Sequence, residues 1–121
     1  MAEKIFVSYA YQDRAIADRI EQYLRKHGLV TTGDLVILDP QREIQSGENI
    51  REVIRRQMMD ANKVVIITSP NSAQSQWVNY EAGMASALGK PIVLIGSRSA
   101  WKTALAAALG DVRSIEIEDA G

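Results

Sequence analysis

One carboxylate, Glu81, lies in a setting that is unusual for a charged side chain. It ends the segment Trp77-Val78-Asn79-Tyr80-Glu81 and shares a stripe of helical spacing with the apolar residues Trp77 and Met84. A carboxylate that leaves water without a partner costs free energy, so Glu81 either meets cations or hydrogen-bond donors, or faces a cleft that uses its charge. A plainer interpretation stays open, in which Glu81 lies near the first turn of a helix and is stabilised by the helix dipole and nearby amides.

Other catalytic groups are scarce in this sequence. It has no cysteine, its eight glycines never form the G-x-G of a dinucleotide-binding loop, and neither a Walker loop nor a G-x-S-x-G nucleophile elbow is present. The single histidine, His27, follows Arg25 and Lys26 at a predicted helix end, where a structural or solvent-exposed role is sufficient. We therefore expect no metal site, and carboxylate chemistry is what remains.

Length and charge limit the class of protein. The 121 residues predict a single domain, residues 1–121. A net charge of -1 argues against a nucleic-acid partner, and the basic residues Arg51, Arg55 and Arg56 are interpreted as the solvent side of a helix. No apolar run approaches membrane-spanning length and the first residues do not resemble a signal peptide, so we expect no membrane partner and a cytoplasmic location.

The apolar pattern predicts alternating strands and helices. The expected strands are 4–9, 35–38, 63–68, 91–95 and 112–117, and the expected helices are 13–26, 49–61, 77–88 and 101–109. Right-handed crossovers then imply an α/β, flavodoxin-like, doubly wound parallel five-stranded sheet of order 2-1-3-4-5, with helices on both faces and the fifth strand at an edge. We expect Asp13 and Ser75 to be N-caps, and the inner face of the second helix to carry Ile50, Val53, Ile54 and Met58.

The expected topology also predicts where a ligand binds. In doubly wound sheets the site lies beyond the carboxyl ends of the strands, where the direction of winding reverses. Here that point lies between the first and third strands, next to the loops 10–13 and 69–76. The second loop leads into the helix that carries Glu81, so the unusual carboxylate falls where the topology predicts a cleft.

At this stage the chain resembles a known family, the TIR domain, and particularly its compact bacterial members. The resemblance rests on Ile5-Phe6-Val7-Ser8-Tyr9 followed by Asp13, on the loop 39–47, on Ser69-Pro70-Asn71-Ser72, and on Trp77-x-x-x-Glu81. These pieces occur in the order that the family has and cover nearly the whole chain.

The resemblance implies an enzyme that hydrolyses NAD+, releases nicotinamide and leaves linear or cyclic ADP-ribose. It makes Glu81 the catalytic residue and NAD+ the substrate, with no further cofactor. Since nicotinamide leaves as a neutral molecule, one carboxylate can suffice without a general acid. The substrate-binding residues that we expect are Tyr9, Tyr11, Ser69, Asn71, Trp77 and Tyr80, and Tyr11 is preferred over Tyr9 as the ligand contact.

The loop 39–48 corresponds to the family's contact between neighbouring TIR domains. We expect Asp39, Arg42, Ile44 and Gly47 to be assembly residues, and other TIR copies in a homo-oligomer or filament to be partners. The match is imperfect, because Ser46-Gly47 replaces the usual Pro-Gly and Leu38-Asp39 replaces Arg-Asp. The domain is expected to come from a longer effector protein with a fused or separate sensor domain.

Three other functions stay open. A non-catalytic TIR scaffold for protein interaction would have a similar residue pattern. A receiver-like phosphoacceptor at Asp39 is disfavoured, because Ser8-Tyr9 stands where a receiver has its acidic pair. A nucleoside-processing transferase of similar fold, which also uses a glutamate, is the most distant of the three.

Overall fold

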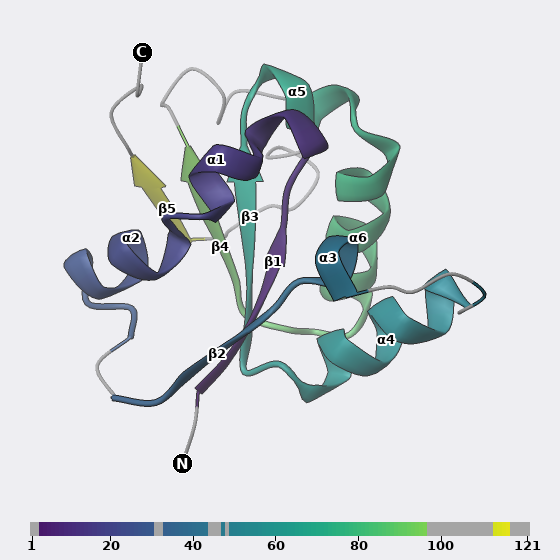
Figure 1. Cartoon of the computed structure of the whole chain (residues 1–121), viewed down its shortest axis with the longest axis horizontal. Helices are drawn as coiled ribbons and strands as arrows, with labels where there is room; N and C mark the ends of the chain where they lie inside the picture. The colour runs from purple at the N-terminus through teal and green to yellow at the C-terminus, as the bar shows by residue number, and fades with distance from the viewer. Residues whose placement is uncertain (1–2, 31–32, 44–46, 48, 97–112, 117–121) are drawn as a thin grey trace.

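The computed structural model describes residues 3–30, 33–43, 47, 49–96 and 113–116. Its centre is a five-stranded sheet of order β2-β1-β3-β4-β5 in which every pair of neighbours is parallel (Figure 1). The strands are β1 (Glu3–Ser8), β2 (Leu35–Leu38), β3 (Lys63–Thr68), β4 (Ile92–Gly96) and β5 (Arg113–Glu116). The predicted strand order and the edge position of the fifth strand are confirmed.

Helices cover both faces of the sheet (Figure 1). One face carries the 3₁₀ turn η1 (Tyr11–Asp13), α1 (Arg14–Ala17) and α2 (Ile20–Lys26), and the other carries α4 (Ile50–Asp60) and α6 (Gln76–Ala87). Two short helices, α3 (Pro40–Glu43) and α5 (Pro70–Gln74), follow the carboxyl ends of β2 and β3. The doubly wound fold is therefore as expected.

Alternation along β1 distributes its side chains between the two layers. Ile5, Val7 and Tyr9 pack in the cluster that includes α1 and α2. Phe6 and Ala10 pack in the cluster that includes α4 and α6, and the period of two places Ser8 on that same side. The end of β1 thus presents a hydroxyl group toward the layer that carries Glu81.

The chain forms more helical segments after its strands than the sequence predicted. The single helix expected at 13–26 is interrupted, because the Arg19 amide bonds to the carbonyl of Ile16 and tightens the turn between α1 and α2. The expected loops 39–48 and 69–76 contain α3 and α5, which both begin at a proline, a residue suited to the first helical position. The predicted helix 101–109 lies outside the described residues.

Of the predictions about helix ends and faces, one was correct and two need correction. Ser75 caps α6, since its hydroxyl oxygen accepts a hydrogen bond from the amide of Val78 at 3.2 Å. Asp13 occupies the N-cap position of α1, but its side chain makes no capping bond. Ile50 does not join the core, because it lies in the first turn of α4 and is 49% exposed.

Candidate functional site

Glu81 is the most unusual group in the fold. It lies in the middle of α6 with an exposed fraction of 0%, and neither of its carboxyl oxygens makes a hydrogen bond to the described part of the chain. Burial raises the pKa of this carboxyl group to about 8, partly opposed by the nearby hydroxyl of Ser8, and the charge of Asp39 raises it further. The Trp77 indole lowers this pKa slightly, although neither it nor Ser8 reaches the geometry of a standard hydrogen bond.

A hollow of about 550 Å³, which we call the neutral hollow, lies beside the start of α6. This volume is within the range of ligand pockets. None of the described residues that line it carries a formal charge, and four of them have side-chain amides. The lining consists of Tyr11, Gln12, Pro40, Gln41, Ile50, Asn71, Gln74, Ser75 and Trp77. Such a surface suits an uncharged or cationic aromatic ring that exchanges hydrogen bonds with amides.

Trp77 connects this hollow with Glu81. It lines the hollow, lies one helical turn before Glu81, and is close enough to influence its pKa. Glu81 itself is not among the lining residues. In this conformation the carboxyl group is therefore buried and does not open into the hollow, and a ligand would reach it only after a conformational change.

A compact polar cluster joins the two loops at the switch point of the sheet. The Ser69 hydroxyl donates a short hydrogen bond to Asp13 Oδ2, and the Asn71 side-chain amide donates to Asp13 Oδ1 at 3.2 Å. The backbone amide of Asn71 donates to Ser69 Oγ at 3.1 Å. Asp13 and Ser69 are 6% and 8% exposed. The carboxylate of Asp13 thus holds the start of α5 instead of capping its own helix.

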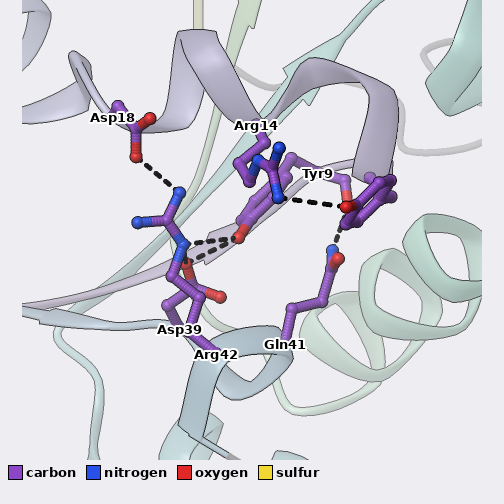
Figure 2. A network of polar contacts seen from close by, with 7 residues as sticks. Tyr9, Arg14, Asp18, Asp39, Gln41 and Arg42 are labelled. Atoms are coloured by element: carbon purple, nitrogen blue, oxygen red, sulfur yellow. Dashed lines mark hydrogen bonds and ion pairs between the residues drawn. The ribbon is translucent and has the colours of Figure 1, made fainter.

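A second network ties α3 to the residues that directly follow β1 and α1 (Figure 2). The Tyr9 hydroxyl donates to Asp39 Oδ2 at 2.8 Å, and Arg42 forms ion pairs with Asp39 at 3.3 Å and Asp18 at 2.5 Å. The Gln41 side-chain amide donates to the Tyr9 carbonyl at 2.5 Å. Burial raises the pKa of the Tyr9 hydroxyl to about 12 and the bond to Asp39 adds to this, so Tyr9 stays protonated as the donor.

A second hollow of about 430 Å³, the charged hollow, adjoins the first through Tyr11 and Gln41, which line both. Its lining is Tyr9, Tyr11, Arg14, Asp18, Gln41 and Arg42. The Arg14 guanidinium lies 4.8 Å from the centre of the Tyr11 ring and donates to its hydroxyl at 3.0 Å. Arg14 has no carboxylate partner in the described segments, whereas Arg42 has two. Arg14 is thus the cation whose charge is available to a ligand.

The residues predicted for substrate binding divide into two groups. Tyr11, Asn71 and Trp77 line the neutral hollow. Tyr9 is buried to 1% exposure and faces the charged hollow, and Ser69 is buried against Asp13. Tyr80 is 42% exposed and is absent from both linings. Their roles toward a substrate stay predictions.

Of the predicted assembly residues, Asp39 directly precedes α3, Arg42 lies within it, and Gly47 follows it. Asp39 and Arg42 belong to the polar network, while Gly47 is exposed and has a φ of 89°, a value that favours glycine. Ile44 lies outside the described residues. Sequence reasoning named the loops that contain Gln12, Gln74 and Ser75 but not these residues as part of the site, and it expected Ile50 in the core. It missed Pro40 and Gln41, because nothing in their local pattern distinguishes them from ordinary surface residues.

The described residues hold neither a candidate metal site nor a candidate membrane-spanning helix. No group of three or more histidine, cysteine, aspartate or glutamate side chains is placed to hold a metal ion. None of the helices described is long and apolar enough to cross a membrane.

Comparison with known proteins identifies the family. The model of the TIR domain matches residues 5–119. A candidate cyclic ADP-D-ribose synthase of Cytobacillus dafuensis is 26% identical over 95 residues, covering 75% of this chain but only 24% of that protein, so the chain spans about a quarter of its relative.

Solved structures agree on the fold. The TIR domain of the Toll-related receptor TRR-2 of Hydra magnipapillata superposes with a TM-score of 0.65 at 14% identity, over 91% of this chain and 82% of that chain. A CMP N-glycosidase of Clostridium botulinum gives a TM-score of 0.61 at 18% identity, over 96% of this chain and 90% of that chain. At these identities the likeness concerns the fold alone. By the match over most of its length, the chain belongs to the TIR domain family.

Proposed function

We propose that this TIR domain cleaves the bond between nicotinamide and ribose in NAD+, with Glu81 as the catalytic residue. The bond from C1′ to the pyridinium nitrogen breaks, and its electron pair leaves with nicotinamide, which becomes neutral. A water oxygen then bonds to C1′ and releases a proton, which yields ADP-ribose. If an adenine nitrogen attacks C1′ in place of water, the product is cyclic ADP-ribose and the proton balance depends on that nitrogen.

The observation that carries the proposal is the buried carboxyl group of Glu81, which has no hydrogen-bond partner in the described residues. A group of this kind costs stability, and such groups concentrate at functional sites. In its ionised form the carboxylate would stabilise the positive charge that develops on the ribose as nicotinamide leaves. The relative from Cytobacillus dafuensis is named for making cyclic ADP-ribose, a product of the same substrate bond, which supports this reaction over a scaffold or a phosphoacceptor role.

The two hollows suggest how NAD+ would lie. The neutral hollow, with Tyr11 and Trp77 as aromatic walls, suits the nicotinamide ring, whose positive charge is attracted to aromatic faces by about 0.5–2 kcal/mol. The diphosphate needs a cation, and Arg14 in the adjoining charged hollow offers one. Tyr11 and Gln41 would then contact the ribose between them.

Activity is proposed to depend on self-association. Glu81 is fully buried and does not line the neutral hollow, so the isolated domain in this conformation should be nearly inactive. The family resemblance suggests that the loop 39–47 of one copy closes the site of the next and thereby activates it. A biological role as a defence or signalling effector rests on the same resemblance. The identity of the reaction product and of the partner protein would distinguish a defence role from a signalling role.

The test is nicotinamide release from NAD+ by the purified chain at high concentration with a crowding agent. Glu81→Gln keeps the size of the side chain and should abolish release. Glu52→Gln makes the same chemical change on the exposed first turn of α4 and should leave it unchanged. Chromatography of the products distinguishes linear from cyclic ADP-ribose.

Three outcomes contradict the proposal in different ways. Equal release by wild type and Glu81→Gln would exclude Glu81 as the catalyst. Cleavage of CMP but not NAD+ would favour the nucleotide chemistry for which the Clostridium botulinum neighbour is named. If a sample that is shown to self-associate releases no nicotinamide, the non-catalytic scaffold is favoured.

A further inference from the structure

We propose that Asp13 is a positioning residue that fixes the side-chain amide of Asn71, so that the site prefers a ligand group that donates a hydrogen bond. The favoured group would be the carboxamide NH2 of nicotinamide, and a base with a methyl group in its place would be disfavoured. This inference deepens the proposed function and rests on it.

The geometry of the cluster fixes which end of the Asn71 amide faces Asp13. An aspartate carboxylate only accepts hydrogen bonds, so the atom of Asn71 that lies 3.2 Å from Asp13 Oδ1 must be the nitrogen. The backbone of Asn71 is held as well, through its amide bond to Ser69 Oγ. Asp13 and Ser69 are buried while Asn71 is exposed, so both contacts are partly buried and water can compete for them only from the side of Asn71.

The carbonyl oxygen of Asn71 is consequently left for a ligand. Asn71 lines the neutral hollow, and no hydrogen bond within the described part of the chain uses its Oδ1. Turning the amide over would bring two oxygens together at Asp13 and is therefore unfavourable. The Asn71 amide thus offers the hollow a fixed acceptor.

Gln41 repeats this arrangement on another wall of the same hollow. Its side-chain nitrogen donates to the Tyr9 carbonyl, which can only accept, so the orientation of this amide is fixed as well and its oxygen is free to accept from a ligand. Two amides from different segments therefore have their nitrogens held by acceptors of the protein. Both amides therefore favour a ligand group that donates a hydrogen bond.

The variant Asp13→Asn should remove this preference. An asparagine at position 13 can present its own NH2 to Asn71, which allows the Asn71 amide to turn over and offer a donor in place of an acceptor. The Ser69 hydroxyl can still donate to the oxygen of the new side chain. The charge and the fixed orientation are lost while the size of the residue is kept.

The measurement compares kcat/KM for NAD+ with that for 3-acetylpyridine adenine dinucleotide, which replaces the NH2 by a methyl group. Asp13→Asn should lower the ratio of the two values about tenfold, the usual effect of one hydrogen bond. Asn71→Ala, which removes the acceptor, should lower it similarly. Comparing ratios between variants cancels the difference between the two leaving groups.

Asp60→Asn is the matched control, because it makes the same change in an exposed ion pair with Lys4, on α4. The ratio of kcat/KM for NAD+ to kcat/KM for the acetylpyridine analogue should be the same in Asp60→Asn as in the wild type. An unchanged ratio in folded Asn71→Ala would overturn the inference, even if Asp13→Asn fails to fold. If the wild type releases no nicotinamide, the proposed function fails instead, and calorimetric binding of nicotinamide and 3-acetylpyridine by the same variants still tests the preference.

Discussion

At neutral pH most molecules hold the Glu81 carboxyl group protonated, because burial raises its pKa to about 8. A neutral carboxyl group is easier to bury than a carboxylate, which explains how α6 tolerates it against the sheet. The ionised form is the one that could stabilise a cationic transition state. Protonation of one residue thus links the stability of the fold to the proposed activity.

The first prediction concerns the pH dependence of the reaction. If the carboxylate of Glu81 is required, kcat/KM for nicotinamide release should rise tenfold per pH unit at lower pH and level off above about pH 8. The positive nicotinamide ring of bound NAD+ favours the ionised form, so kcat should level off at a lower pH than kcat/KM. Initial rates across this range provide the measurement, and a flat profile would contradict the role of Glu81.

The same residue predicts how stability changes with pH. Between the ordinary pKa of 4.5 and about 8, the folded state binds more protons at Glu81 than the unfolded state does, so the free energy of unfolding falls as pH rises. The slope from this group is at most about 1.4 kcal/mol per pH unit. Glu81→Gln removes this contribution to the slope. The free energy of unfolding of the variant, relative to that of the wild type, should therefore increase as the pH rises. Urea unfolding at several pH values, with Glu52→Gln as control, tests this; a constant difference between the two proteins would refute it.

At the scale of elements, the order of the strands could be predicted because it depends on repeated patterns. Buried runs, crossovers and the Ser75 cap each follow from local sequence. The short helices α3 and α5 could not, because each follows a strand as a brief polar stretch without helical periodicity. The exposure of Ile50 was missed because periodicity gives the face of a helix but not where the core beneath it ends.

The candidate site was predictable only in part. The inward position of Glu81 follows from its place on an apolar stripe of α6, and its burial agrees with this. The topology brings the loops 10–13 and 69–76 together but does not say which of their side chains pair, so the bonds of Asp13 to Ser69 and Asn71 could not be predicted. The neutral hollow likewise draws its walls from several separate segments, so no local motif encodes it.

The pairing of β3 with β4 gives a prediction about a single glycine. Gly96 lies opposite Thr68 at the end of both strands, and a Cβ atom at position 96 would overlap the hydroxyl and the carbonyl of Thr68. Gly96→Ala should therefore lower the free energy of unfolding by about 1–3 kcal/mol. Gly83→Ala is the control, since nothing lies within 4 Å of a Cβ there and alanine in a helix should add roughly 0.5–1 kcal/mol. Chemical denaturation measures both, and equal stability of the two variants would contradict the prediction.

The start of α1 gives a prediction about substrate binding. Arg14→Gln should raise the KM for NAD+ about tenfold and change kcat little, because the diphosphate would lose one charge-assisted contact away from the reacting atoms. Nicotinamide riboside, which has no phosphate, should be cleaved equally by both proteins. Arg19→Gln removes the same charge from an exposed residue outside both linings and serves as control. A similar loss for both substrates would argue against a diphosphate contact.

At the scale of the whole molecule, the predicted assembly residues and the predicted catalytic residue share one network of neighbours. Asp39 raises the pKa of Glu81, and Arg42 holds Asp39 while also pairing with Asp18 of the segment after α1. A partner that engages α3 would disturb these ion pairs and, through Asp39, the pKa of the carboxyl group that we propose to be catalytic. Self-association could therefore change both access to Glu81 and its charge.

Self-association through α3 predicts that two inactive variants restore one another. If the α3 segment of one copy completes the site of the next, Arg42→Ala lacks the contact but keeps Glu81, whereas Glu81→Gln lacks the catalyst but keeps the contact. In a head-to-tail assembly of equal amounts, about a quarter of the sites combine an intact Glu81 with an intact neighbouring segment. Nicotinamide release by the mixture should approach that fraction of wild-type activity. A mixture of Arg42→Ala with the double variant Arg42→Ala/Glu81→Gln should release no nicotinamide. If neither mixture releases nicotinamide, Arg42 acts only within its own chain.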